Sequence, residues 1–132
     1  KIDFENIEFT YNLALNEDIY IDEIDKTFKS KVIAADEFDI DHMKEGYQYI
    51  DLGKIKGKLT LRNKRQGDKI RLQGGTKKIK ELFIGMKIPR EDRSLVPLIV
   101  DESMVVSVCG YRINADYKID DNTEKILEFT LE

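Results

Sequence analysis

The chain has 132 residues, of which 41% are hydrophobic and 36% charged, and its formal net charge is −4. This length and composition are typical of one globular domain and exclude a disordered or low-complexity protein. The longest apolar runs, such as residues 98–100, are far shorter than the ~20 residues that cross a bilayer, and the chain does not open like a signal peptide. We therefore expect a cytoplasmic protein that makes no membrane contact.

Short strands are predicted over the first half of the chain. Apolar and polar residues alternate there, with enrichment in β-branched and aromatic types, and Gly53 and Gly57 separate two of the segments. Gly67-Asp68 gives a turn signal before the alternation resumes. The predicted strands are residues 2–4, 7–9, 19–21, 31–34, 47–52, 59–62 and 69–72.

A helix is predicted over about residues 76–87. Its apolar residues recur at i, i+3, i+4 and i+7, which places them in one stripe. These residues are Ile79, Leu82, Phe83 and Met86. Thr76 is the expected N-cap, and Ile88 before Pro89 indicates the end because a residue before proline avoids helical geometry. Pro89 then begins a short helical turn over about residues 89–93.

Strands are predicted again over residues 95–100, 104–109 and 126–131, with turns at 101–103 and 120–122. A chain that is mostly strand with one main helix indicates the α+β class. The sequence contains no internal repeat and no linker, so we expect one domain over the whole chain.

Charge is segregated along the chain. Residues 1–53 hold 5 Lys and Arg against 14 Asp and Glu, residues 54–93 hold 14 against 4, and residues 94–132 hold 3 against 8. Nucleic-acid binding depends on the local field and not on the total charge, so the middle segment is a candidate polyanion site. The alternative is that its cations only pair with the acidic flanks after folding. Composition alone leaves these two interpretations evenly matched.

The start of the predicted helix is the most informative feature of the basic segment. Lys77 and Lys78 in a first helical turn would oppose the helix dipole, and Gly74 and Gly75 precede them. Violations of a local rule tend to mark functional sites, so this pattern indicates a helix N-terminus that binds phosphate.

A broad basic face is expected around this helix. Lys80 and Lys87 are seven residues apart, so they should project to one flank. Such breadth favours a sugar–phosphate backbone over a single nucleotide, although the same cations can simply keep the surface soluble. The other cations of this face are Arg62, Lys64, Arg65, Lys69, Arg71, Arg90 and Arg93.

An independent enzyme is the least favoured interpretation. The chain lacks a P-loop, a dinucleotide fingerprint, a nucleophile elbow and a histidine-centred triad, so no catalytic residue is predicted. Asp68 is expected to fix its turn, with a salt bridge as a second role. His42 is expected in a solvated loop and Cys109, the single cysteine, in the core as an inert thiol. No metal site is predicted.

Four aromatic residues are candidates for stacking on nucleic-acid bases: Tyr47, Tyr49, Phe83 and Tyr111. Phe83 also belongs to the apolar stripe of the helix, which points to the core. Tyr111 is the preferred candidate of the four.

Several motifs occur in order through the middle of the chain. They are Leu61-Arg62-Asn63-Lys64-Arg65-Gln66-Gly67-Asp68, then Lys77-Lys78-Ile79-Lys80-Glu81-Leu82-Phe83, then Lys87-Ile88-Pro89-Arg90, with Arg93, Pro97 and Gly110. Together they resemble the C-terminal domain of tRNA(Ile)-lysidine synthetases. The resemblance is tight over about residues 49–112 and looser in the first third, and Gln66 stands where the family often has proline.

The resemblance implies a tRNA-binding domain that contacts the acceptor stem. In this family an N-terminal domain uses ATP and Mg²⁺ to join lysine to the wobble cytidine of tRNA(Ile), so the present chain is expected to be a fragment without catalysis or cofactor of its own. The residues expected to bind RNA are Arg62, Lys64, Arg65, Lys77, Lys78, Lys80, Lys87, Arg90, Arg93 and Arg112. The residues expected to shape turns are Gly67, Asp68, Pro89 and Gly110.

The implied fold is a layered, mostly antiparallel β-sandwich, similar to a substrate-contacting module of the phenylalanyl-tRNA synthetase β chain. The implied partners are tRNA(Ile) and the protein's own N-terminal catalytic domain, and a homo-oligomer is left open. The main rival is a protein-interaction module that docks its basic face on an acidic partner and has no preference for RNA.

Overall fold

The computed structural model describes residues 7–132, except for the side chain of His42. The α-helix is α1 (Ile79–Gly85), and a six-residue 3-10 helix, η6 (Arg90–Leu95), follows it. The strands are β1 (Thr10–Asn12), β2 (Ile19–Ile21), β3 (Lys26–Ala34), β4 (Gln48–Asp51), β5 (Leu59–Arg62), β6 (Lys69–Leu72), β7 (Gly75–Lys78), β8 (Leu98–Asp101), β9 (Met104–Val108), β10 (Arg112–Ile113) and β11 (Lys125–Leu131). The strand predicted at residues 2–4 lies outside the described residues.

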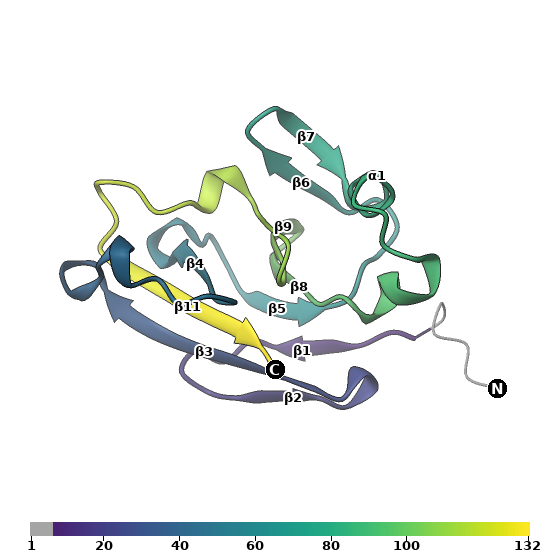
Figure 1. Cartoon of the computed structure of the whole chain (residues 1–132), viewed down its shortest axis with the longest axis horizontal. Coiled ribbons are helices and arrows are strands. Elements are labelled where there is room, and N and C mark those ends of the chain that lie inside the picture. Colours follow the sequence, from purple (N-terminus) through teal and green to yellow (C-terminus); the bar gives the residue numbers. More distant parts are fainter. Residues whose placement is uncertain (1–6) are drawn as a thin grey trace.

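Two antiparallel sheets and a hairpin form three layers (Figure 1). In the described part of the chain, one sheet has the strand order β1-β5-β8-β9-β10 and the other has the order β2-β3-β11-β4. The hairpin β6-β7 and α1 lie on the side of the first sheet that faces away from the second. The α+β class with mostly antiparallel sheets is as predicted.

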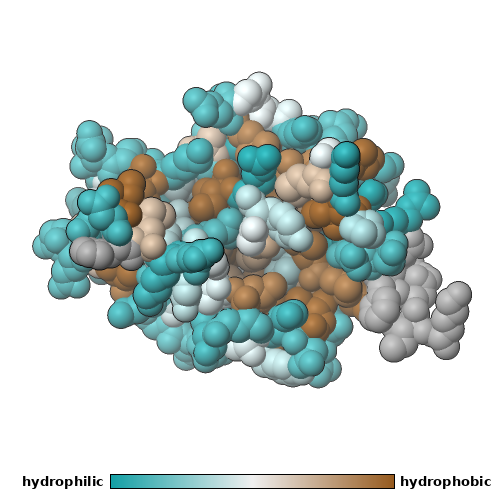
Figure 2. Space-filling view, viewed as in Figure 1, coloured by the Kyte–Doolittle hydropathy of each residue, from teal (hydrophilic) through white to brown (hydrophobic). Residues whose placement is uncertain are grey.

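The first core lies between the two sheets. Leu59 and Leu61 alternate along β5 and are buried, and across from them Phe28 of β3 and Phe129 of β11 stack with ring centroids 5.7 Å apart. On the outside, Figure 2 shows hydrophilic side chains around the outline of the molecule with smaller hydrophobic areas between them. This core fixes the relative position of the two sheets.

The second core joins α1 and the hairpin to the first sheet. Three residues of the predicted stripe, Ile79, Leu82 and Phe83, are buried, and Phe83 has no exposed surface. Met86, the fourth, is the C-cap of α1 and is partly buried. Strand β8 is buried along its whole length, because Leu98 and Val100 enter this second core while Ile99 enters the first. A strand that is buried on both faces has a nearly continuous run of apolar residues, and residues 98–100 of β8 form such a run.

The strand predictions hold for most segments, with one clear difference near the N-terminus. Residues 7–9 do not form a strand, and β1 begins at Thr10. The reason is that the Asn63 side chain takes the backbone partners of this segment: its Nδ2 donates to the carbonyl of Ile7 at 2.7 Å and its Oδ1 accepts from the amide of Phe9 at 3.3 Å.

The helix begins later than predicted, which removes the expected phosphate cradle. Residues 75–78 form β7 and pair with β6, with Lys78 opposite Lys69. Thr76 is therefore a strand residue, and Lys78 is the N-cap without a side-chain cap hydrogen bond. Gly75 has a φ of 123° at the hairpin turn and does not precede a free helix end.

The helix also ends earlier than predicted. Lys87 has a φ of 58°, its amide donates to the carbonyl of Ile84 at 3.0 Å, and the amide of Ile88 donates to the carbonyl of Phe83 at 3.1 Å. These two bonds form a Schellman motif, in which the residue after the C-cap is left-handed. Lys87 therefore lies beyond the helix, and the predicted shared flank with Lys80 is wrong. The helical turn predicted at 89–93 is confirmed as η6, with Pro89 at its N-cap.

Candidate nucleic-acid interface

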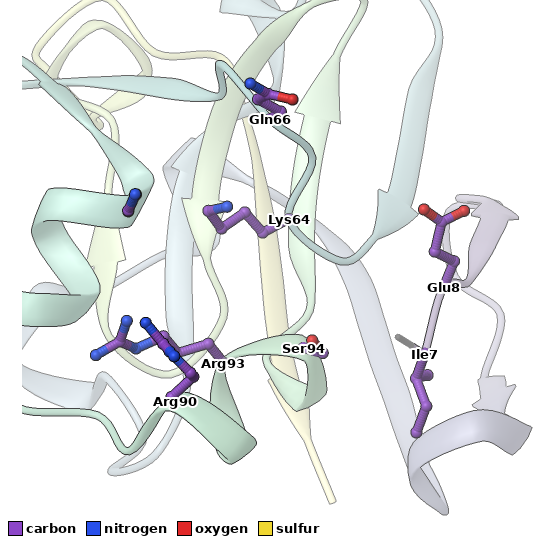
Figure 3. Close-up of a pocket in the computed structure, with 8 residues that line it drawn as sticks. Ile7, Glu8, Lys64, Gln66, Arg90, Arg93 and Ser94 are labelled. Atoms are coloured by element: carbon purple, nitrogen blue, oxygen red, sulfur yellow. The ribbon is translucent and has the colours of Figure 1, made fainter. Parts of the chain in front are cut away.

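A cationic pocket lies beside α1 and η6 (Figure 3). Its volume is about 500 Å³. Four cations line it, and they come from three places in the chain: Lys64 from the β5–β6 loop, Lys80 from the first turn of α1, and Arg90 and Arg93 from η6. The other lining residues are Ile7, Glu8, Gln66 and Ser94.

The positions of these cations follow from local structure. Arg90 and Arg93 are three residues apart in a 3-10 helix, so their side chains leave on the same side. The Nε of Arg93 donates to the carbonyl of Ile88 at 3.0 Å, which orients its guanidinium. Figure 3 shows the side chains of Arg90, Arg93 and Lys64 on one side of the pocket, with Glu8 on the opposite side.

Among residues 7–132, the side chains that line the pocket carry an excess of positive charge. Four of them are cations, and one, Glu8, is a carboxylate. Within residues 7–132, neither Lys64 nor Lys80 forms an ion pair with a carboxylate. A concave surface with this excess of positive charge attracts anions, and phosphate groups are good partners for both Arg and Lys.

A buried asparagine holds the walls of the pocket together. Asn63 is 2% exposed, and its Nδ2 donates to the carbonyls of Ile7 at 2.7 Å and of Ser94 at 3.0 Å. Its Oδ1 accepts from the amide of Phe9 and from Nη1 of Arg65. This one side chain therefore ties the N-terminal segment, the β5–β6 loop and η6 to each other around the pocket.

Two arginines brace the same loop from within. Arg62 makes a two-point ion pair with Asp68, with Nη1–Oδ2 at 2.8 Å and Nη2–Oδ1 at 3.0 Å. The same carboxylate accepts from the amide of Arg65 at 2.7 Å. The Nη2 of Arg65 donates to the carbonyl of Phe9 and to Oγ1 of Thr10 at 2.9 Å. Both guanidinium groups are thus committed to internal hydrogen bonds, and the two roles predicted for Asp68 are confirmed.

The outer face of the hairpin carries a second group of cations. Lys69 and Lys78 are directly opposite each other in the ladder, and both are exposed. Like charges at directly opposed positions destabilise a strand pair. Arg71 shares this face, and its Nε lies 3.4 Å from a carboxylate oxygen of Asp116. The lysine pair makes this face a candidate contact for a second anion, separate from the pocket.

Comparison with known proteins identifies a family with this sequence pattern. The sequence model of the TilS substrate C-terminal domain matches residues 59–129, a stretch that includes Asn63 and most of the pocket. The chain belongs to this family. The match runs from β5 into β11, so it includes the second core, the hairpin and part of the first core of this TilS C-terminal domain.

Two curated relatives named tRNA(Ile)-lysidine synthase resemble the TilS C-terminal domain described here. That of Clostridioides difficile (strain 630) is 40% identical over 124 residues, which cover 94% of this chain and 27% of the relative. That of Caldanaerobacter subterraneus subsp. tengcongensis is 39% identical over 109 residues, which cover 80% of this chain and 23% of the relative. The chain therefore spans about a quarter of the length of these relatives.

A solved structure shares the fold. The crystal structure of a TilS C-terminal domain superposes with a TM-score of 0.79 at 21% sequence identity, and the match covers 96% of this chain and 97% of that one. The layered arrangement of two antiparallel sheets with few helices is thus the fold of the TilS C-terminal domain.

The predicted RNA-binding residues lie in five places in this TilS C-terminal domain. Lys64, Lys80, Arg90 and Arg93 come together in the pocket. Lys77 and Lys78 lie on β7, and Lys87 lies in the turn after α1. Arg62 and Arg65 are engaged in the β5–β6 loop, and Arg112 is exposed on β10. Contact of any of them with RNA stays a prediction.

Two of the residues predicted to shape turns have a left-handed backbone. Gly67 and Gly110 have φ values of 87° and 84°, which favour glycine, and Pro89 precedes η6. Among the stacking candidates, Tyr49 is 4% exposed and donates through its hydroxyl to Glu128 at 2.9 Å. Tyr111 is 49% exposed and remains available for stacking.

Sequence reasoning missed Asn63 and Glu8. In the sequence, Asn63 is simply a polar residue after a strand. The two carbonyl groups that its side chain contacts belong to residues 31 and 56 positions away in the chain. Glu8 belongs to a segment assigned to a strand, so its place opposite the cations was not foreseen. The signal that could have found Asn63 is an amide side chain at the end of a buried strand, where backbone groups need partners.

Predictions from the sequence also concern the single cysteine, the single histidine, a metal site and a membrane-spanning segment. Cys109 is buried, and burial raises the pKa of its thiol to about 12. No group of three or more His, Cys, Asp and Glu side chains that could hold a metal is found in the described residues. Within the same part of the chain, no helix has the length and apolar content needed to cross a membrane. The backbone of His42 lies in a 3-10 turn (Ile40–His42), and its side chain lies outside the described part.

Proposed function

We propose that this chain is the tRNA-contacting C-terminal domain of a tRNA(Ile)-lysidine synthase. The family match and the names of the relatives support this proposal. Because the chain spans about a quarter of those relatives, ligase activity is proposed only for a longer protein that includes this domain.

The observation that carries the RNA-contacting role is the pocket that four cations and one carboxylate line in the described part of the chain. A double-stranded stem is recognised mainly through its phosphates, 2′-hydroxyls and shape. The pocket and the outer face of the hairpin supply cations at two places on one side of the first sheet, which suits successive phosphates of a duplex. We propose the acceptor stem of tRNA(Ile) as this duplex.

The chemistry of lysine transfer is proposed for the N-terminal domain of the longer protein. That domain would bind ATP and Mg²⁺ and join lysine to the wobble cytidine, while the present domain positions the tRNA body. The longer protein is expected to work in the cytoplasm, where its tRNA substrate is found. Its direct partners would be tRNA(Ile) and the adjoining catalytic domain.

The proposal can be tested by RNA binding across salt concentrations. The probe is an acceptor-stem hairpin of an isoleucine tRNA, titrated against the 132-residue chain and against a Lys64→Gln/Lys80→Gln variant. The matched control is Lys31→Gln/Lys125→Gln, which removes the same charge from exposed positions on the second sheet. Each phosphate neutralised should contribute a slope of about −0.7 to −0.9 in log K against log salt.

The expected result is salt-dependent binding that weakens in the pocket variant, with a slope shallower by about 1.5, and that persists in the control. Equal losses in both variants would mean that only total charge matters, which contradicts a specific pocket. Absence of RNA binding even at low salt, together with binding to an acidic protein, would favour the protein-interaction alternative.

A further inference from the structure

A second pocket lies at the edge between the two sheets, and it differs from the cationic pocket in chemistry. Its volume is about 350 Å³, near the lower end of small-molecule sites. It forms where the start of β4, the end of β11 and the β9–β10 turn meet, since Gln48 and Phe129 are directly paired in the second sheet. The lining residues are Gly46, Gln48, Cys109, Gly110, Tyr111, Phe129, Thr130 and Leu131.

None of the described residues that line this pocket has a charged side chain. Its floor is apolar, because Phe129 and Cys109 are almost fully buried there. The floor and the missing charge disfavour a phosphate and favour a neutral ligand with a flat apolar surface.

The orientation of Gln48 is fixed by its partners. Its Oε1 accepts from the amide of Gly110 at 3.0 Å and from the hydroxyl of Ser107 at 3.2 Å. A backbone amide can only donate, so the oxygen and not the nitrogen must face Gly110. The Nε2 group of Gln48 therefore points away from these contacts, and no residue in the described chain accepts a hydrogen bond from it.

Tyr111 supplies an aromatic surface at the same place. Tyr111 is 49% exposed, and no hydrogen bond of its hydroxyl is found among residues 7–132. The other strongly exposed tyrosine, Tyr20, differs because its hydroxyl donates to Asp25 at 2.7 Å. A half-exposed ring beside an apolar floor is suited to stacking on a second planar ring.

We propose that this pocket binds an unstacked nucleobase, which stacks on Tyr111 and accepts a hydrogen bond from Nε2 of Gln48. The inference rests on the proposed function for the source of the base, which is a single-stranded nucleotide next to the duplex held by the cations. Sequence-tolerant stacking is common where proteins bind single strands, because every base has an aromatic face.

The test compares two RNA hairpins with the same duplex, one blunt and one with unpaired 3′ nucleotides that include the fluorescent base 2-aminopurine. The unpaired nucleotides should raise affinity about tenfold and quench the 2-aminopurine fluorescence. Tyr111→Leu keeps an apolar side chain without the aromatic face. Gln48→Glu keeps an oxygen acceptor for Ser107 and Gly110 while it removes the donor group. Both variants should abolish the gain and leave binding of the blunt hairpin unchanged.

The matched control is Tyr20→Leu, which removes an exposed tyrosine elsewhere and should retain the gain. Binding of the blunt hairpin with no gain from the unpaired nucleotides, or a gain that survives in Tyr111→Leu and Gln48→Glu, would overturn this inference and leave the proposed function standing. If neither hairpin binds, neutral nucleosides are titrated into the protein while the NMR resonances of the Gly110 and Tyr111 amides are followed, which tests base binding by the pocket directly. Shifts that disappear in Tyr111→Leu support the pocket, and no shifts overturn it.

Discussion

Arg62 and Asp68 meet through two parallel hydrogen bonds across the β5–β6 turn, at 2.8 Å and 3.0 Å, with side chains only 15% and 8% exposed. A planar guanidinium and a carboxylate match each other in this two-point geometry. The pair closes the loop that presents Lys64 to the cationic pocket.

Removing either partner of this pair should destabilise the fold. We expect Asp68→Ala and Arg62→Ala each to lower the free energy of unfolding by about 3 kcal/mol, because each leaves a largely buried charge unpaired. The double variant should lose less than the sum of the two, which urea denaturation of all four proteins would measure. Additive losses would show that the two side chains act independently.

Asn63 should matter for both stability and the shape of the cationic pocket. Asn63→Leu leaves the amide of Phe9 and the carbonyls of Ile7 and Ser94 without their partner, so we expect a loss of about 2–3 kcal/mol. Hydrogen exchange at the Phe9 amide should accelerate in this variant more than exchange within β11. Unchanged protection at Phe9 would contradict the role of Asn63 as the tie between these segments.

Glu8 should weaken anion binding at the pocket that it lines. We expect Glu8→Gln to raise affinity for the acceptor-stem hairpin roughly twofold to fivefold at low salt, since it removes a repulsion between like charges. Glu124→Gln is the control, because Glu124 is exposed and lies outside the pocket. Equal gains in the two variants would point to net charge and not to the position of Glu8.

The left-handed residue after α1 offers a gain in stability. Lys87 has a φ of 58°, which costs a non-glycine residue roughly 1–2 kcal/mol. Lys87→Gly should raise the free energy of unfolding by about 1 kcal/mol, whereas Lys87→Ala should give no gain because alanine keeps the strained backbone. RNA binding by these two variants also separates the effect of the Lys87 charge from that of its backbone. A loss of affinity common to both variants reports the missing ammonium group, and a difference between them reports the backbone.

The buried thiol should make stability depend on pH in alkaline solution. Burial raises the pKa of Cys109 from 9.0 to about 12. The folded state therefore holds the thiol proton more tightly than the unfolded state does. The resulting contribution to the free energy of unfolding is complete below about pH 9 and is lost as the pH rises towards 12. Between about pH 8 and about pH 10.5, the free energy of unfolding should fall more for the natural chain than for Cys109→Ala. Parallel curves for the two proteins would contradict this.

Much of the fold could be predicted from local sequence patterns. The alternation of apolar and polar residues in β5 indicates a strand that is buried on one face, and the apolar run in β8 indicates a strand that is buried on both. The apolar stripe of α1 indicates which side of the helix packs against the core. The main error came from Gly74-Gly75. Two glycines between alternating segments are also a hairpin signal, and here strand pairing with β6 prevailed over helix formation.

The candidate site was harder to predict because its arrangement depends on contacts between distant residues. Lys64, Lys80, Arg90 and Arg93 were recognised as basic residues, but only the fold gathers them and assigns Arg62 to an internal ion pair. The orientation of Gln48 depends on Ser107 and Gly110, which lie 59 and 62 residues away. No local pattern contains that information.

Strand β8 contributes Ile99 to one core and Leu98 and Val100 to the other. Neither core can therefore open fully without exposing apolar side chains of the strand that serves both. The helical layer and the far sheet should lose their structure in one cooperative step, with fluorescence and circular dichroism giving coincident transitions. Damage to the layer that carries the cations would then be felt at the far sheet, because one strand contributes apolar side chains to both cores.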